Sequence, residues 1–318
     1  MRLLTVRHIT VYRYAVPIRL EEHRMMFRPR ESHDLRLVRT QLTIVPQPMR
    51  LRWLHDVFDN SVAIATFSGE TTGLCFDSVV TLEHTEAELP DYQLEAGAQT
   101  YPFSYSLEDQ PDLVCAMERE EPSDAVDRWA NRFLPQNGHI ATIELLRTMT
   151  HRIQQDFTYM RREERGVQSP SETLQRGSGT CRDFAWLMID AVRSLGFAAR
   201  FVSGYIFVPA VATIGGGATH AWLQVYLPGA GWVDFDPTNS IIGNRNLIRV
   251  AVAWHPARVL PLWGTFIGAP DAAIDMQVEV TVTEEPVAMA MNENAREAQE
   301  HRQTQGPHCL AGDCVPMS

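Results

Sequence analysis

A glycine-rich turn runs directly into an amphipathic helical pattern at residues 177–196. The turn reads Gly177-Ser178-Gly179-Thr180, which suits a tight bend followed by a helix cap. Gly196 follows the pattern and can end a helix in the left-handed conformation. The apolar residues between them recur at alternating steps of three and one, as on one face of a helix: Phe184, Leu187, Met188, Ala191, Val192 and Leu195. The pattern predicts a helix that begins near Cys181 and is buried on one side.

Cys181 falls in the first turn of this predicted helix. Unpaired backbone N–H groups and the helix dipole favour an anion at that end, and the thiolate is the nucleophilic form of cysteine. The same N–H groups could hold the oxyanion of a tetrahedral intermediate. A buried packing cysteine is the alternative, because free cysteines are often buried. The residues that follow favour a nucleophile.

Two strands after the helix carry a histidine and an aspartate. Residues 198–208 are rich in β-branched and aromatic side chains and predict a strand, and 209–218, with three glycines, predicts a mobile loop. Residues 220–227 and 232–236 predict a hairpin around a Pro-Gly-Ala-Gly turn. His220 would begin one strand and Asp236 would end its partner, so the two side chains can meet.

The order thiol, imidazole, carboxylate suits a nucleophile, its base and the group that orients the base. Asp234 is an equally placed carboxylate, because a period of two residues puts it on the same sheet face as Asp236. The spacing does not choose between them. A core histidine at 220 and a turn-capping aspartate before Pro237 are the structural alternatives.

Three stretches resemble the transglutaminase-like superfamily, whose core is a papain-like cysteine fold. They are GSGTCRDFAWLMIDAVRSLGFAARFVSGY, THAWLQVYLPGAGWVDFDPTN, and FTY at 157–159. The match covers roughly residues 140–245 and is closest to the bacterial transglutaminase-like proteins, often described as cysteine proteases. The resemblance implies that Cys181 is the nucleophile, His220 the base and Asp236 the third member.

The N-terminal segment resembles the β domain found ahead of this core. The matching residues are His8, Thr10, Tyr12 and Tyr14, then Arg28-Pro29-Arg30, then Asp56 to Asn60. The family usually has glycine where this chain has Asp59, a mild change because Asp tolerates a left-handed turn. After the core, relatives carry a Gly-Arg-Asp-Tyr-type segment where this chain has residues 253–257. That difference bears on substrate preference and leaves the three residues intact.

The predicted fold class is α+β. Residues 1–86 predict an N-terminal antiparallel β-sandwich from several short strand patterns, and 87–125, rich in proline and acids, a connector. Residues 126–285 are assigned to a papain-like transglutaminase core of helices packed on an antiparallel sheet. Helices are expected at 124–136 and 139–157, and strands at 245–252 and 275–283. Residues 286–318 predict a disordered tail.

Four aromatic residues are further candidates at the site. Tyr159 could polarise the substrate carbonyl or be a buried hydroxyl tied to the backbone. The three tryptophans could wall a substrate cleft or pack in the core: Trp222, Trp232 and Trp254.

The composition limits the classes of molecule that the protein can bind and the compartment in which we expect it. The net charge of −11 argues against nucleic acid. No apolar run is long enough to span a membrane and no secretory signal is seen, so we expect a cytoplasmic protein. The odd count of five cysteines does not suit a disulfide framework. We expect Cys75 and Cys115 to be reduced packing residues. Cys309 and Cys314 are expected to lie in an exposed tail, and a metal clip or a redox pair is the alternative. The sequence contains no nucleotide-binding glycine motif, so no organic cofactor is expected. No metal is expected either.

The sequence therefore predicts a cysteine-dependent acyl-transfer enzyme that cleaves an amide or peptide bond through a thioester. Its partner would be a peptide or protein substrate, and water is the favoured acceptor, because no amine site is visible. The alternatives are a protein-glutamine transglutaminase, a non-catalytic peptide-binding scaffold, and a metal-assisted hydrolase that uses the same three side chains. The sequence indicates neither the substrate nor the oligomeric state.

Overall fold

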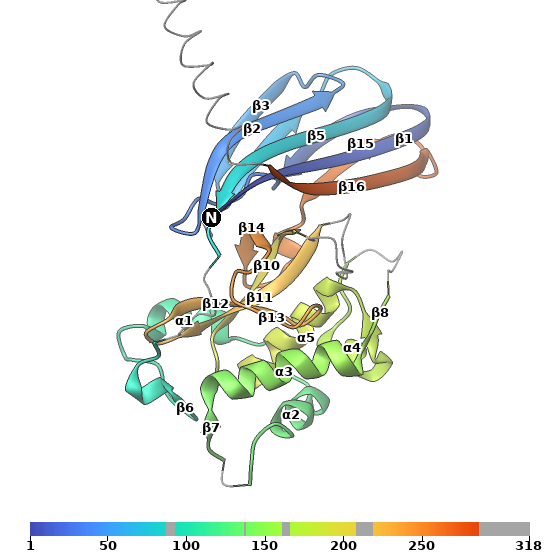
Figure 1. Ribbon diagram of the computed structural model, residues 1–318. Helices are drawn as coiled ribbons and strands as arrows, with labels where there is room; N and C mark the ends of the chain where they lie inside the picture. The colour runs from blue at the N-terminus through green and yellow to red at the C-terminus, as the bar shows by residue number, and fades with distance from the viewer. Residues whose placement is uncertain (87–92, 137, 161–165, 208–218, 286–318) are drawn as a thin grey trace, which may run out of the picture.

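The computed structural model describes residues 1–86, 93–136, 138–160, 166–207 and 219–285. Figure 1 shows a strand-rich domain lying against one side of a mixed core of helices and sheet. The predicted glycine-rich loop at 209–218 and the tail at 286–318, with Cys309 and Cys314, lie outside the described residues.

The N-terminal domain is built on one long strand, β1 (Arg2–Met25). Its first half pairs with β5 (Thr71–His84) on one edge and β16 (Ala273–Glu285) on the other. Its second half pairs with β4 (Ser61–Thr66) and β15 (Leu262–Ile267). Two further strands complete the sheet, β2 (Leu35–Val45) beside β5 and β3 (Arg50–His55) beside β4. The order is β2-β5-β1-β4-β3.

The predicted sandwich is one curled sheet whose two halves share β1. Apolar side chains from both halves form one buried cluster between them. Phe76 and Leu74 on β5 meet Ala63 and Ala65 on β4 in this cluster. Alternation along β5, where every second residue from Leu74 to His84 is buried, explains why the chain forms strands here.

The last two strands belong to this sheet, not to the core. β16 pairs with β1 from Leu3 opposite Glu285 to Tyr14 opposite Ala273. The predicted core range of 126–285 therefore includes two strands that complete the N-terminal domain. Alternation identified the strand at 275–283 but carries no information about its partner.

The core places helix α5 (Cys181–Ser194) against a five-stranded sheet of order β13-β12-β11-β10-β14. The strands of this sheet are β10 (Ala199–Ile206), β11 (His220–Leu227), β12 (Gly231–Asp236), β13 (Ile241–Ile242) and β14 (Leu247–Ala253). The predicted apolar stripe of α5 is buried, and Gly196 after it has a φ of 87°. Alternate residues of β11, among them Leu223 and Val225, join the α5 cluster.

Short elements surround α5. The helices are α1 (Gln110–Met117), α2 (Asp124–Asn131), α3 (Thr142–Asp156) and α4 (Pro170–Arg176), with 3-10 turns η1 (Ala96–Ala98) and η2 (Pro256–Arg258). Two small strand pairs are β6 (Thr100–Tyr101) with β7 (Ile140–Ala141), and β8 (Thr158–Tyr159) with β9 (Ser178–Gly179). α3 begins later than predicted, because Ile140 and Ala141 pair with β6 instead.

The domains meet through specific polar contacts. The side-chain amide of Asn60 donates to the carbonyl oxygen of Val252 on β14 at 2.8 Å and accepts a hydrogen bond from the Val252 N–H at 2.9 Å. Asn60 therefore bonds to both polar groups of one core residue's backbone. Asp59 has a φ of 61°, the left-handed conformation expected from the sequence. His8 Nδ1 lies 2.9 Å from the hydroxyl of Tyr205 on β10, and His8 Nε2 lies 3.1 Å from Thr10.

The buried His8 contact makes stability depend on pH. Burial lowers the pKa of His8 to about 4, whereas an unfolded histidine titrates near ~6.5. The unfolded chain therefore binds a proton that the folded state excludes, and stability must fall as pH drops from about 6.5 toward 4. The full effect of one such group is on the order of 3 kcal/mol.

We expect His8→Gln to flatten this acid slope, because glutamine can bond to Tyr205 and Thr10 without titrating. The measurement is the free energy of unfolding from urea titrations between pH 4 and 7. His33→Gln, at an exposed position, is the control and should keep the wild-type slope. Equal slopes for wild type and His8→Gln would contradict the prediction.

Candidate active site

The Cys181 turn is held by a buried carboxylate. Asp183 is fully buried and accepts the backbone N–H of Thr180 at 2.7 Å, which caps α5. Its other oxygen accepts the backbone N–H of Gln168 at 2.8 Å. A Cβ at Gly179 would lie 2.8 Å from Asp183 Cβ and 2.9 Å from Gln168 Nε2, so the turn needs glycine there. Cys181 is thus fixed at the first position of the helix, with 6% of its surface exposed.

His220 and Asp236 form a buried pair. His220 Nε2 lies 2.8 Å from Asp236 Oδ2, and neither side chain has any exposed surface. The other oxygen of Asp236 accepts the backbone N–H of Thr238 at 2.9 Å, and Asn239 donates its amide to Oδ2 at 2.9 Å. Burial favours the neutral forms, but the mutual attraction outweighs it, so the pKa of His220 is raised and that of Asp236 is lowered.

Cys181 is the second neighbour of His220. The interaction of its thiol with the imidazole helps to raise the pKa of His220. Asp236 occupies Nε2, and Nδ1 is buried without an oxygen or nitrogen partner among the described residues. Nδ1 is therefore the nitrogen left for the sulfur. The three residues come from α5, the start of β11 and the end of β12, as the sequence predicts.

Asp234 has different partners. Its Oδ1 accepts the indole N–H of Trp222 at 2.7 Å, and its Oδ2 pairs with Arg249 at 3.1 Å. Both aspartates lie on one face of β12, but only Asp236 reaches His220. The strands explain this: Leu223 lies opposite Phe235, so Asp236 is the diagonal neighbour of His220 and Asp234 that of Trp222.

The aromatic candidates divide into two groups. Trp222 is fully buried and stacks on His220, and Tyr159 pairs through its backbone with Gly179, beside the Cys181 turn. Trp232 and Trp254 instead pack on each other, with Arg200 over Trp232 at 4.1 Å and Phe58 against Trp254 at 5.3 Å. This aromatic cluster corresponds to the core-packing alternative for those two residues.

Two residues beside the site were not among the sequence candidates. Asn239, three residues after Asp236, holds the carboxylate, and Gln168 holds the cap of the Cys181 helix. An Asp-Pro-Thr-Asn run is typical of a local turn, which was the available signal for Asn239. Gln168 gave none, because its contact with Asp183 depends on the tertiary fold.

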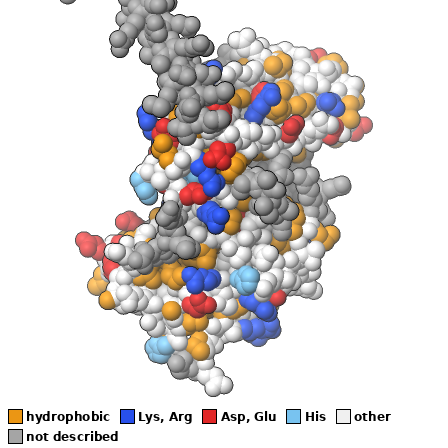
Figure 2. All heavy atoms as spheres, in the orientation of Figure 1, with side chains coloured by type: hydrophobic (Ala, Val, Ile, Leu, Met, Phe, Trp, Pro, Cys, Tyr) orange, Lys and Arg blue, Asp and Glu red, His pale blue; other side chains and the backbone are white. Residues whose placement is uncertain are grey.

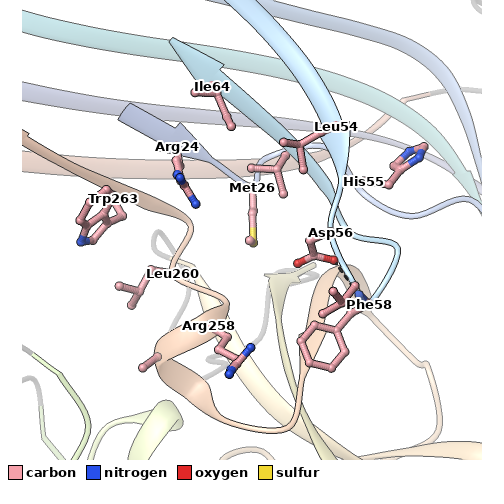
Figure 3. Close-up of a pocket in the computed structure, with 13 residues that line it drawn as sticks. Arg24, Met26, Leu54, His55, Asp56, Phe58, Ile64, Arg258, Leu260 and Trp263 are labelled. Atoms are coloured by element: carbon pink, nitrogen blue, oxygen red, sulfur yellow. Dashed lines mark hydrogen bonds between the residues drawn. The ribbon is translucent and has the colours of Figure 1, made fainter. Parts of the chain in front are cut away.

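A pocket of about 800 Å³ lies between the N-terminal domain and the η2 turn. Figure 3 shows Arg24 from β1 and Arg258 from η2 on opposite sides of it, with apolar side chains such as Met26 between them. Arg182, next to Cys181, donates to the carbonyl oxygen of Pro256 at 2.6 Å and ties η2 to α5. The turn that forms one wall of the pocket is thus bonded to the Cys181 helix, but the three central residues do not line the pocket.

The surface and the remaining side chains add two observations. Figure 2 shows acidic and basic side chains interspersed over the visible face, without a large patch of one sign. Among the described residues, no three His, Cys, Asp or Glu side chains gather as metal ligands. In the same part of the chain, every helix is too short or too polar to cross a bilayer.

Comparisons with known proteins match both parts of the chain. Residues 130–237 match the model of the transglutaminase-like superfamily, and residues 4–83 that of the bacterial transglutaminase-like N-terminal region. Uncharacterised proteins of Mycobacterium tuberculosis and Mycobacterium bovis are each 32% identical over 291 residues, which is 86% of this chain and 91% of theirs.

A solved structure supports the same architecture. A crystal structure described as a "Putative Cysteine Protease" from Cytophaga hutchinsonii superposes with a TM-score of 0.63 and 15% identity, covering 90% of this chain and 92% of that one. At this identity the likeness concerns the fold. The two matched segments, the mycobacterial relatives and the shared architecture together show that the chain belongs to the bacterial transglutaminase-like proteins of the transglutaminase-like superfamily.

Proposed function

We propose that this protein is a cysteine-dependent acyl-transfer enzyme that cleaves an amide bond through a thioester of Cys181. The observation that carries the proposal is the fully buried 2.8 Å pair of His220 and Asp236, whose remaining ring nitrogen is left for the Cys181 thiol at the start of a helix. Such a pair supplies a proton acceptor for the thiol and fixes the imidazole orientation. Membership of the superfamily and the fold shared with the Cytophaga protein support the same activity.

The first half-reaction forms the thioester. In the resting pair His220 already holds the Cys181 proton as an imidazolium. The thiolate sulfur attacks the amide carbon, so that the carbonyl electron pair moves onto oxygen. We assign the stabilisation of that oxyanion to the N–H groups at the start of α5. When the intermediate collapses, the C–N bond breaks, and the leaving amine takes the proton from His220. Asp236 stabilises the imidazolium throughout.

The second half-reaction transfers the acyl group to an acceptor. Water, deprotonated by His220, would attack the thioester carbon and release the acid with the free thiol of Cys181. An amine acceptor would release a new amide by the same steps. We favour water, because it is the default acceptor.

The Cys181 thiol should react with iodoacetamide well below pH 8. His220, whose pKa is raised, stays protonated at neutral pH and can stabilise the thiolate, so labelling should persist to low pH. In His220→Ala, labelling should titrate like an ordinary thiol, near pH ~8.5. Mass spectrometry of the Cys181 peptide measures both, and Cys75 is the internal control, because burial raises its pKa. Ordinary titration of wild-type Cys181 would remove the catalytic proposal in favour of a scaffold.

The two aspartates should differ in their effect on acylation. p-Nitrophenyl acetate should acetylate Cys181 with a burst of p-nitrophenol, and Cys181→Ala should show none. Asp236→Asn should slow the burst by about 100-fold or more, because the amide disturbs the imidazole orientation and charge. Asp234→Asn should slow it less, because Asp234 does not touch His220. A larger effect of Asp234→Asn would show that Asp236 is not the third member.

The choice of acceptor can be read from the product. With the same ester as acyl donor, we expect acetate as the main product even when methylamine is added at millimolar concentration, because water is in large excess over the amine. Gas chromatography or NMR distinguishes acetate from N-methylacetamide. The Cys181→Ala variant corrects for uncatalysed aminolysis. A predominance of the amide over that background would assign the enzyme to the transamidating class.

A further inference from the structure

The imidazole of His220 is held on its face as well as on its edge. The indole of Trp222 stacks on it, with ring centroids 5.8 Å apart and an angle of 27° between the planes. The indole is itself fully buried and lies close to the β10 backbone, since a Cβ at Gly204 would be 2.7 Å from Trp222 Cη2. The hydrogen bond to Asp236 fixes the direction of Nε2 but allows the ring to tilt about that bond. The stack with Trp222 removes that freedom.

The indole is in turn held by a partly buried ion pair. Asp234 is 3% exposed and accepts the Trp222 N–H through one oxygen. Its other oxygen pairs with Arg249 on β14 at 3.1 Å. A buried carboxylate needs such a cation, because an unpaired one is strongly destabilising. The position of Arg249 therefore sets the position of Asp234, and through it that of Trp222.

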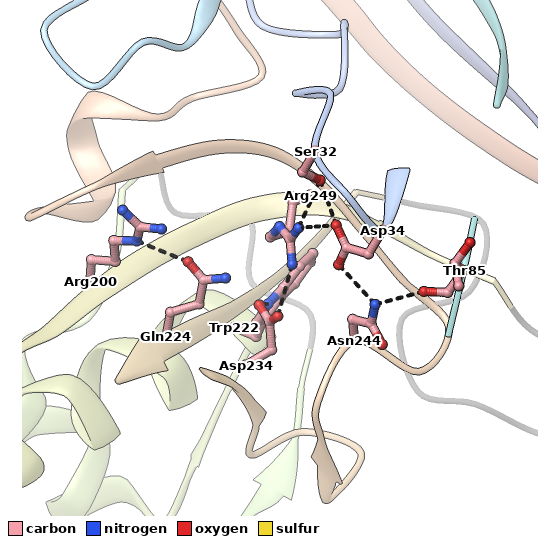
Figure 4. A network of polar contacts seen from close by, with 9 residues as sticks. All are labelled: Ser32, Asp34, Thr85, Arg200, Trp222, Gln224, Asp234, Asn244 and Arg249. Atoms are coloured by element: carbon pink, nitrogen blue, oxygen red, sulfur yellow. Dashed lines mark hydrogen bonds and ion pairs between the residues drawn. The ribbon is translucent and has the colours of Figure 1, made fainter. Parts of the chain in front are cut away.

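Arg249 also reaches the N-terminal domain. Its second nitrogen, Nη2, pairs with Asp34 Oδ1 at 2.6 Å, just before β2. Burial would raise the pKa of Asp34, but Arg249 and the neighbouring hydrogen bonds outweigh it and lower the pKa to about 2. The other oxygen of Asp34 accepts the amide of Asn244 at 2.8 Å. Figure 4 shows this chain of contacts running from Asp34 through Arg249 and Asp234 to Trp222.

We propose that Asp34, Arg249 and Asp234 are positioning residues through which the N-terminal domain fixes Trp222 against His220 and so sets the geometry of the Cys181–His220 pair. The inference rests on the proposed function of those two residues. Charges of alternating sign in a partly buried row have one favourable arrangement, because a shift of one member leaves its neighbour unpaired. The titratable groups that act directly on His220 from the described elements are Asp236 on β12 and Cys181 on α5.

The test compares variants at the two ends of this row. Asp34→Asn keeps the shape of the side chain and removes its charge, and Trp222→Phe keeps an aromatic ring and removes the N–H. We expect each to lower the rate constant for Cys181 alkylation by iodoacetamide at pH 6 by about 10-fold, which corresponds to ~1.4 kcal/mol, and to move the midpoint of the pH profile upward. Arg2→Met is the matched control, because Arg2 joins the same two domains through Asn246 and has no contact with Asp234.

Each outcome either supports or overturns the positioning role. Shifted profiles in both variants with a wild-type profile in Arg2→Met support the positioning role. A wild-type profile in either variant overturns it, even if the melting temperature falls, because a purely structural ion pair would do no more than that. A shift of equal size in Arg2→Met also overturns it, since general loosening of the domains would then be the cause. If Asp34→Asn does not fold, Arg249→Lys replaces it. Failure of the proposed function is distinct, because it appears in the wild type as an ordinary thiol profile.

Discussion

The buried pair of His220 and Asp236 is the interaction around which the core sheet is arranged. Two groups of opposite charge with no exposed surface are costly to bury unless neighbouring donors and acceptors bond to them. The chain supplies these partners locally: the N–H of Thr238 and the amide of Asn239 follow Asp236 directly. The short segment after β12 therefore supplies the hydrogen bonds that water would otherwise give to the buried Asp236 carboxylate.

The same constraint divides the core sheet into two unlike faces. One face carries alternate apolar residues such as Leu223 and Phe235 and packs on α5. The other carries His220, Trp222, Gln224 and the two aspartates, all buried. Polar groups buried on a sheet face need a covering layer that brings complementary charge. The N-terminal domain provides that layer through Asp34, and it also forms hydrogen bonds with the backbone of β14 through Asn60.

Local patterns in the sequence were enough to locate the central elements. Strand β11 has the predicted bounds, and the glycine turn, cap and stripe placed the start of α5 at Cys181. Periodicity and turn chemistry act over a few residues, so a single sequence contains them. The choice between Asp234 and Asp236 was different: both sit on one face, and only the diagonal register with β11 separates their partners. Family resemblance selected Asp236, and strand spacing alone did not.

The first and last described strands, β1 and β16, are hydrogen-bonded neighbours, although more than two hundred residues separate them in the chain. The transglutaminase-like core is thus an insertion within a host domain, and the matched N-terminal region at 4–83 lacks the two strands, β15 and β16, that complete its sheet. Until residues 262–285 have left the ribosome, one edge of β1 has no partner along most of its length. An open edge of that length can template aggregation, so a chain shortened before β15 would lose more than two strands. It would also expose the edge of β1 along which the N-terminal domain is completed after the inserted core.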